Sequence, residues 1–282
     1  MPLWEGVSIS RFPISLVIIT LNEEKGIARA IESASFCSDI VVLDSGSTDN
    51  TCQIARELGA RVFLEEWRGF RDQKQRATDL ALHDWVLSLD GDEAVSSELR
   101  EEIKSLLNTW ARGESQGHFN IDGFRMPRLT WNLGRWIRHG GWYPDYQLRL
   151  YNRTRAKWVG GQVHEHVRAE RVERLKAPLL HYPFPRHADQ VATNNRYSGL
   201  GAEALDSKGE KFQLLKLIFK PYSKFLETYF IKRGFLDGLP GFIIAVGAAY
   251  SIFLKYAKLW EMQNLKKEEK PVGELSPSFE RE

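Results

Sequence analysis

The sequence of 282 residues has few cysteines, almost no net charge and no apolar leader at its start. Cys37 and Cys52 are its only cysteines, too few for a disulfide framework or a cysteine-based metal site. The formal net charge of +2 does not by itself indicate a nucleic-acid partner. The opening residues, MPLWEGVSISRF, lack both a basic flank and a long apolar run. We therefore expect no secretory signal and a location inside the cell.

What the sequence does contain is a regular alternation of apolar runs and helix-like segments between residues 14 and 90. We expect strands over residues 14–20, 39–43, 61–65 and 85–89. We expect helices after Asn22, from the caps Ser47 and Thr48 to Gly59, and over 72–83. This βαβα order predicts an α/β fold, a mostly parallel sheet with helices on both faces. Ligands bind at the carboxyl ends of such strands, where TLNEE, DSGSTD, EEWRGF and DGDE fall.

The fourth apolar run ends at two carboxylates, Asp90 and Asp92, which are separated by Gly91. After a strand, such residues can project to one side of the turn, and glycine allows a ligand close to the backbone. Two carboxylates repel each other and any phosphate, whereas Mg²⁺ or Mn²⁺ binds carboxylate and phosphate oxygens together. The pair therefore predicts a metal bridge to a diphosphate, with a solvated loop as the alternative. An EF-hand is excluded because Ala94 occupies its third ligand position.

Four ordered motifs carry a wider pattern: IITLNEE (18–24), VVLDSGSTDNT (41–51), the spacing from Lys74 to Asp90, and LSLDGDE (87–93). Together they resemble the family 2 glycosyltransferases, which have a Rossmann-like GT-A nucleotide-sugar fold. Residues 123–182, with GGWYPDYQLRLYNR and VHEHV, resemble the lipopolysaccharide-core branch of that family. The resemblance implies a metal-dependent inverting glycosyltransferase. Its donor would be a UDP-sugar, UDP-glucose, from which it would transfer glucose. Its acceptor would be an inner-core heptose of a lipid-linked oligosaccharide, the lipid A-core.

The resemblance also implies a nucleotide-sugar site, made of Thr20, Leu21, Glu23, Asp44, Lys74, Asp90 and Asp92. Leu21 and Ser45 depart from the family, which often has tyrosine and a second aspartate there, and this bears on base recognition. Helix capping is the alternative role for Thr20 and Glu23, and a solvated position is the alternative for Lys74.

Inverting displacement needs a base that takes the proton of the acceptor hydroxyl. We favour Asp145, which precedes a strand-like run and matches the acidic residue that the family places in its acceptor-side loop. Glu165 is the second candidate. Its neighbours His164 and His166 alternate along an extended chain, so one of them could approach the metal while the other packs. We assign His166 to the metal with Asp90 and Asp92, and ordinary packing is the alternative.

Aromatic and arginine side chains are concentrated just before and around Asp145. They are Trp131, Trp136, Trp142, Tyr143, Arg125, Arg128, Arg135 and Arg138. Aromatic faces stack on sugar rings and arginines bind phosphates, which suits a phosphorylated glycolipid acceptor. For any single residue of this set, ordinary packing or surface charge is the alternative.

The C-terminal third mixes lysines with apolar residues over 211–233, a composition typical of a membrane interface. The uncharged run 238–254 is shorter than the roughly 18 to 20 residues of a spanning helix. We expect a helical segment in or dipping into the cytoplasmic leaflet of the bacterial inner membrane, where anionic lipids attract the lysines. The alternatives are a spanning helix and a soluble helix that is buried or forms a homo-oligomer.

These expectations divide the chain into an N-terminal extension (1–13), a GT-A domain (14–206) and a helical C-terminal region (207–282). Within the domain, residues 14–94 form the nucleotide-sugar half and 95–206 the acceptor half. Two rival functions remain at this stage. A sugar-nucleotide pyrophosphorylase would need a glycine-rich basic loop where this chain has TLNEE, and a membrane scaffold could bind the nucleotide without catalysis.

Overall fold

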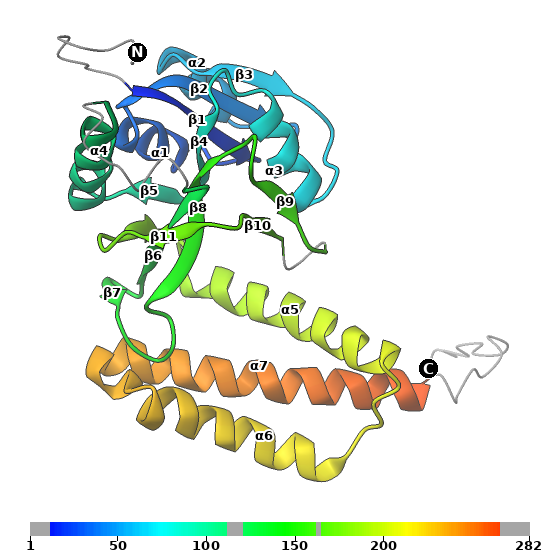
Figure 1. Ribbon diagram of the computed structural model, residues 1–282. Coiled ribbons are helices and arrows are strands. Elements are labelled where there is room, and N and C mark those ends of the chain that lie inside the picture. Colours follow the sequence, from blue (N-terminus) through cyan, green and yellow to red (C-terminus); the bar gives the residue numbers. More distant parts are fainter. Residues whose placement is uncertain (1–11, 112–120, 162–164, 266–282) are drawn as a thin grey trace, which may run out of the picture. The chain divides into compact units, whose positions relative to one another are not determined.

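The computed structural model describes residues 12–111, 121–161 and 165–265. The chain divides into two compact units, Met1–Pro185 and Arg186–Glu282. The first unit is an α/β fold and the second consists of helices (Figure 1). Helix α5 (His187–Ser207) belongs to the second unit, where it packs on another helix, although the expected GT-A domain included these residues up to 206.

Four parallel strands form one half of the main sheet, in the order β3-β2-β1-β4. They are β1 (Phe12–Thr20), β2 (Cys37–Asp44), β3 (Arg61–Leu64) and β4 (Trp85–Asp90). The connecting helices are α1 (Ile27–Ser33), α2 (Thr51–Glu57) and α3 (Phe70–Asp79). The predicted alternation of strands and helices is confirmed, although the helix expected over 72–83 ends at Asp79.

The other half of the sheet mixes both strand directions. β8 (Asp145–Asn152) runs antiparallel to β4 and to β6 (Gly123–Asn132), and β12 (Leu179–His181) runs parallel to β6 and antiparallel to β5 (Glu93–Val95). β7 (Arg135–Ile137) and β11 (Val172–Arg174) also pair with β6. β9 (Lys157–Val159) and β10 (His166–Arg168) form a separate two-stranded sheet. This half brings β8 directly beside the strand that ends at Asp90.

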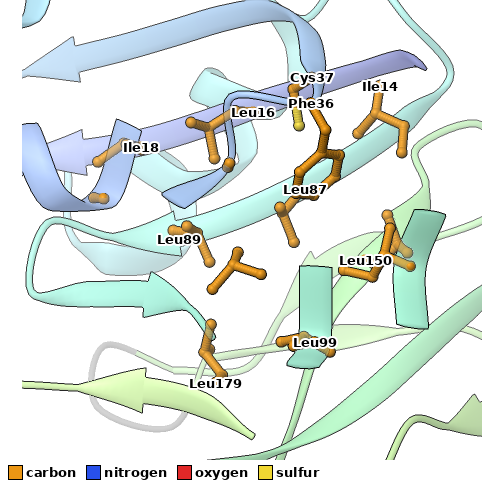
Figure 2. Close-up of a cluster of buried hydrophobic side chains, with 14 of the residues drawn as sticks. Ile14, Leu16, Ile18, Phe36, Cys37, Leu87, Leu89, Leu99, Leu150 and Leu179 are labelled. Carbon is orange, nitrogen blue, oxygen red and sulfur yellow. The ribbon is translucent and has the colours of Figure 1, made fainter. Parts of the chain in front are cut away.

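Two hydrophobic clusters cover the two faces of the sheet. On one face, Ile14, Leu16 and Ile18 of β1 pack with α1 and with α4 (Ser97–Ala111), and Figure 2 shows them with side chains of β4, α4 and β8. On the other face, Val17 packs with Ala77 of α3 and with residues of β8. Burial on both faces explains why β1 is continuously apolar over residues 16–19. The strand also holds the polar ends of β2 and β4 on either side of it.

The second unit contains three long helices, α5, α6 (Leu214–Leu226) and α7 (Gly238–Leu265). A π-helical turn, η2 (Glu227–Ile231), and a 3-10 turn, η3 (Gly234–Asp237), connect α6 to α7. Both α5 and α6 pack against α7, which lies between them (Figure 1). The expected apolar segment 238–254 thus forms only the first part of a longer helix. By length and composition, the stretch Gly234–Asn264 meets the requirements of a membrane span.

Candidate functional site

The polar residues that follow β1, β2 and β4 meet at one end of the sheet. In the strand register, Thr20 stands opposite Asp44, and Ile19 stands opposite Asp90. Asp44 and Asp90 therefore flank the end of β1. This arrangement follows from the parallel order of the strands, which brings their carboxyl ends to one edge.

Ser47 connects the loops that follow β1 and β2. Its hydroxyl accepts a hydrogen bond from the Asn22 backbone N–H at 2.7 Å and donates one to Asp44. Asp44, which is fully buried, also accepts the backbone N–H groups of Gly46 and Ser47 at 2.9 and 2.7 Å. The prediction that Ser47 and Thr48 cap α2 is wrong, since Asn50 occupies the N-cap position without a side-chain hydrogen bond. The Ser47 hydroxyl is already used by the other loop.

Asp90 is held between two cations. Lys74 Nζ lies 2.9 Å from its Oδ1 and Arg149 Nη2 lies 2.6 Å from its Oδ2. Burial alone would raise the pKa of Asp90, but the charges of Arg149 and Lys74 bring it well below its usual range. The carboxylate is therefore ionised, and its two ion pairs fix the orientation of the Asp90 side chain. Lys74 also contacts Glu165, at 3.2 Å.

The same network continues from Arg149 towards Asp145. Arg149 Nη2 lies 2.7 Å from Oε1 of Glu93, a side chain with no solvent exposure. Arg128 lies 3.3 Å from Glu93 and 2.7 Å from Asp145. Positive and negative groups thus alternate from Glu165 to Asp145. Glu93 and Arg149 were not predicted from the sequence. The available signal was a charged residue next to apolar strand residues, at the start of EAV for Glu93 and between the leucines of LRL for Arg149.

Asp92 has a different neighbour from Asp90. Its Oδ2 lies 3.4 Å from Nε2 of His181, and Nδ1 of His181 lies 3.2 Å from the Thr130 hydroxyl. His181 ends β12, the strand that pairs with both β6 and β5. The sequence analysis did not single it out, although it follows an apolar strand just as Asp90 does. Asp92 and His181 together offer oxygen and nitrogen donors to a cation.

Two cavities meet at Asp90. The first, of about 520 Å³, is called the aromatic cavity and is lined by Ile19, Thr20, Leu21, Glu23, Trp67, Phe70, Asp90, Gly91, Asp92 and His181. The second, of about 570 Å³, is called the charged cavity and is lined by Lys74, Asp90, Arg125, Arg128, Tyr146, Gln147, Leu148, Arg149, Trp158, Glu165, His166 and Val167. Asp90 lines both cavities. A ligand that extends through both would pass this carboxylate.

The predicted metal ligands fall into different cavities. Asp90 and His166 both line the charged cavity, whereas Asp92 lines the aromatic cavity with His181. Within residues 12–111, 121–161 and 165–265, no three His, Cys, Asp or Glu side chains form a group that could hold a metal. A cation bound by one or two protein ligands together with substrate phosphates fits this arrangement. A closed site made only of protein ligands does not.

Glu23 and Thr20 lie beside Gly91 in the aromatic cavity. Burial, together with the charges of Asp92 and Asp49, raises the pKa of Glu23 to about 7. A methyl group at Gly91 would lie 2.9 Å from Cγ of Glu23, so the glycine permits this close packing. The Thr20 hydroxyl is buried and has no hydrogen-bond partner within the described part of the chain. Thr20 and Glu23 thus offer polar groups to a ligand at this point.

The two candidate bases differ in exposure. Asp145, with a side chain that is 40% exposed, accepts hydrogen bonds from Arg128 at 2.7 Å and from Gln147 at 2.8 Å. Glu165, at 15% exposure, lines the charged cavity and faces Lys74. His164, the neighbour of Glu165 that could also approach the metal, lies outside the described residues. Both described carboxylates therefore border on cations of the network.

Not all members of the aromatic and arginine set lie at the cavities. Arg125 and Arg128 line the charged cavity. Trp131 and Trp136 instead pack edge to face with a centroid separation of 5.1 Å, and Trp136 contacts Tyr182 at 5.3 Å. These two tryptophans are thus at least partly engaged with other aromatic rings.

Comparisons with known proteins assign the sequence to a family. The family model described as Glycosyl transferase family 2 matches residues 15–176. The chain belongs to glycosyl transferase family 2. This family 2 glycosyltransferase is 32% identical over 266 residues to the lipopolysaccharide core biosynthesis glycosyltransferase LpsC of Rhizobium meliloti (strain 1021), covering 92% of this chain and 96% of that protein. The resemblance seen in the motifs is confirmed, which favours a transferase over a pyrophosphorylase.

Two further comparisons name other similar proteins. An uncharacterised glycosyltransferase of Rickettsia typhi is 32% identical, with 88% of this chain and 87% of that protein covered. A crystal structure of glucosyl-3-phosphoglycerate synthase from Mycobacterium tuberculosis in complex with phosphoglyceric acid has a TM-score of 0.43 at 20% identity. The comparison covers 63% of this chain and 74% of that one.

Proposed function

We propose that this family 2 glycosyltransferase transfers glucose from UDP-glucose, with inversion, to inner-core heptose of lipopolysaccharide or to another lipid-linked acceptor. The main support is the position of Asp90, which lines both the aromatic and the charged cavity. A nucleotide in the first cavity would then have its sugar directed towards the second. The name of the Rhizobium meliloti relative supports the class of acceptor. Glucose and heptose are proposed from the motif resemblance.

The aromatic cavity suits a nucleoside. Trp67 and Phe70 stand edge to face with ring centroids 4.7 Å apart, and 49% and 39% of their surfaces are exposed. Exposed aromatic rings in a cavity offer a face on which a base can stack. The unpartnered Thr20 hydroxyl could bind a polar group of the nucleotide. Leu21 lines the same cavity, which agrees with its proposed place in the nucleotide site. Asp44 is fully buried and does not line this cavity, so we propose that it supports the site by holding the loop after β2.

Asp92 and His181 would hold Mg²⁺ or Mn²⁺, with Asp90 next to them. Asp92 is the more available carboxylate, because both oxygens of Asp90 already contact Lys74 and Arg149. When bound, the cation supplies positive charge that stabilises the departing diphosphate. His166 remains a proposed ligand from the charged cavity, and Lys74 adds a cation close to Asp90.

We assign the base to Asp145. The acceptor oxygen forms a bond to the anomeric carbon while the bond from that carbon to the diphosphate oxygen breaks. The hydroxyl proton passes to the base, and UDP leaves with the bonding electron pair. Asp145 is more exposed than Glu165 and is thus better placed to meet an incoming acceptor. Glu165 would instead hold Lys74 in place.

The proposal is tested by incubating the full chain with a panel of UDP-sugars and truncated lipopolysaccharide, with and without EDTA. We expect UDP release that requires UDP-glucose, acceptor and a divalent cation. Binding of UDP without its release from any donor in the presence of acceptor would favour a non-catalytic scaffold. Release that EDTA leaves unchanged would overturn the metal assignment.

Matched amide variants separate the two candidate bases. Asp145→Asn should lower turnover by at least roughly a hundredfold while UDP-glucose binding stays measurable, since a general base contributes about that much or more. Glu165→Gln should retain more turnover. The reverse order of effects would assign the base to Glu165.

We also place the enzyme at the cytoplasmic face of the inner membrane. A lipid-linked acceptor is held in the bilayer, so an enzyme that modifies it must approach the surface. The apolar stretch Gly234–Asn264 supports such an association by length and composition. A homo-oligomer is a further proposal, which the size of the protein in solution would test.

A further inference from the structure

The second unit exposes a continuous row of large apolar side chains on α6. Leu214, Leu215, Ile218, Phe219 and Tyr222 are each between 54% and 68% exposed. Their spacing along the sequence places them on one side of the helix. No residue of α6 is fully buried, although α6 packs against α7. This row is therefore an apolar surface that the rest of the unit does not cover.

The row is extended by the turn that joins α6 to α7. This corner, residues 230–239, exposes Phe230, Ile231, Phe235, Leu236 and Leu239, whose exposures run from 45% to 76%. Soluble proteins rarely expose this much contiguous apolar surface without a partner. We call the α6 row and the corner together the apolar edge.

Positive charge accompanies the apolar edge. Residues 211–233 contain six basic side chains and one acidic side chain, Glu227, a difference of five positive charges. The basic residues are Lys211, Lys216, Lys220, Lys224, Lys232 and Arg233. Lysines next to apolar side chains match the chemistry of an anionic lipid surface, where the tails meet the headgroups.

The opposite side of α7 is covered by a polar helix. Lys258 Nζ on α7 donates to the backbone oxygen of Asn195 at 2.6 Å and to the Ser198 hydroxyl at 2.9 Å. Further along, Gln263 donates to the Asp206 carboxylate at 3.1 Å. These contacts hold α5 against the C-terminal half of α7. That half is thus bound to polar partners and is not free to be surrounded by lipid.

This packing bears on whether α7 crosses the bilayer. Its 28 residues would extend about 42 Å, but the uncharged part, 238–254, covers only about 26 Å, less than the roughly 30 Å of a hydrocarbon core. A spanning orientation would place Lys255 or the polar contacts of α5 in or against the hydrocarbon layer. Ionised side chains are strongly disfavoured there. The length of α7 is therefore not a reason to regard it as spanning.

We propose that the apolar edge seats this enzyme in one leaflet of an anionic membrane, and that α7 lies along the surface without crossing it. This inference rests on the proposed function in so far as a lipid-linked acceptor requires the enzyme at the membrane. It assigns the contact to α6 and the corner rather than to the most apolar helix. The polar helix α5 faces away from the lipid.

Binding to vesicles tests the surface directly. We expect the full chain to co-sediment with vesicles that contain phosphatidylglycerol and to bind pure phosphatidylcholine vesicles more weakly. Leu215→Glu combined with Phe219→Glu should reduce binding at least roughly tenfold, because two charged side chains replace apolar contacts. Leu200→Glu on α5, a site with 39% exposure, is the matched control and should bind as the unaltered protein does.

A second pair of variants tests the charge. Lys220→Gln combined with Lys224→Gln should lower binding to the anionic vesicles roughly 10- to 30-fold, with less effect on neutral vesicles. Vesicle binding that is unchanged in the α6 double variant would overturn the proposal. So would a dimer in the absence of lipid that the same double variant dissociates, since a second copy of the chain would then cover the edge.

Labelling distinguishes a seated helix from a spanning one. Leu239→Cys is introduced together with Cys52→Ser, and the remaining Cys37 is buried. A maleimide trapped inside the vesicles should not label position 239, and labelling from inside would show that α7 spans. UDP release with a detergent-free, water-soluble acceptor fragment is measured in parallel and should be unchanged by the α6 variants. If the unaltered protein releases no UDP with this fragment, the result would count against the proposed function and not against the membrane surface.

Discussion

Nη2 of Arg149 lies 2.6 Å from Asp90, and the same nitrogen lies 2.7 Å from Glu93. Arg149 is only 4% exposed, whereas the Asp90 side chain keeps 27% exposure towards the cavities. Glu93 in turn accepts the backbone N–H of Asp90 through Oε2, at 3.1 Å. Arg149 and Glu93 thus hold both the side chain and the backbone of Asp90 in position. Neither need contact substrate to affect the reaction.

Arg149→Met should destabilise the protein and slow the reaction. It leaves the buried carboxylate of Glu93 and the partly exposed carboxylate of Asp90 without their shared cation. We expect a loss of about 3 to 5 kcal/mol in the free energy of unfolding. Urea unfolding measures this value. The double variant with Glu93→Gln should recover part of the stability, since one uncompensated charge is removed. Arg71→Met, which breaks an exposed ion pair with Asp72, is the control and should unfold as the unaltered protein does.

Asp92→Asn should raise the Mn²⁺ concentration needed for half-maximal UDP binding, by roughly tenfold or more if Asp92 is a ligand. His181→Asn should act in the same direction, because its Nε2 faces the same carboxylate. Calorimetric titration of Mn²⁺ in the presence of UDP measures both effects. Glu101→Gln on the exposed face of α4 is the control. A metal requirement that neither substitution changes would remove this pair from the proposed site.

Glu23→Gln should stabilise the protein at high pH only. Glu23 has a pKa of about 7 in the folded chain, against an ordinary value of 4.5, because burial disfavours its charged form. Folding free energy is therefore lost as the pH rises from about 4.5 to 7, and glutamine removes that loss. We expect a gain of about 1 to 2 kcal/mol at pH 8, allowing for partial exposure, and little at pH 4.5. Urea unfolding at both values measures it, and a gain independent of pH would contradict this origin.

Gly26→Ala should mainly lower stability, whereas Gly91→Ala should mainly lower nucleotide affinity. A methyl group at Gly26 would lie 2.5 Å from the backbone oxygen of Gly91, which cannot move without moving the loop, so we expect a loss of about 1 to 3 kcal/mol in stability. A methyl group at Gly91 would meet the flexible side chain of Glu23, so nucleotide affinity should fall more than stability. Thermal unfolding and UDP titration separate the two. Gly161→Ala meets no atom within 4 Å and is the matched control.

Trp67→Leu should weaken UDP binding about tenfold with little change in thermal unfolding. The side chain is half exposed and lines the aromatic cavity, so a stacking contact with the base is lost while core packing is not. UDP titration by calorimetry measures the affinity. Leu82→Ala removes another exposed apolar side chain, outside the cavity lining, and should bind UDP normally. Equal losses in both variants would point to a general effect on the fold.

The sequence analysis located the edge of the sheet but did not identify the neighbours of its carboxylates. Strands and helices were predictable because apolar periodicity is a local property of the chain. The pairing of Asp90 with Arg149 was not predictable, because the two residues are 59 positions apart and the antiparallel pairing of β8 with β4 is a long-range contact that no local pattern encodes. The α2 cap was misplaced because the Ser47 hydroxyl is bonded to the loop that follows β1.

By itself, the sequence determined the parallel half of the sheet, the position of Asp90 and Asp92 at a strand end, and the family motifs. Each of these is encoded in short, contiguous stretches. Only the tertiary structure decided that Asp90 faces Arg149 and Lys74, that His181 faces Asp92, and that α5 covers one side of α7. These relationships arise when distant segments are packed together, because a side chain can be satisfied by any complementary group that the fold brings within hydrogen-bonding distance.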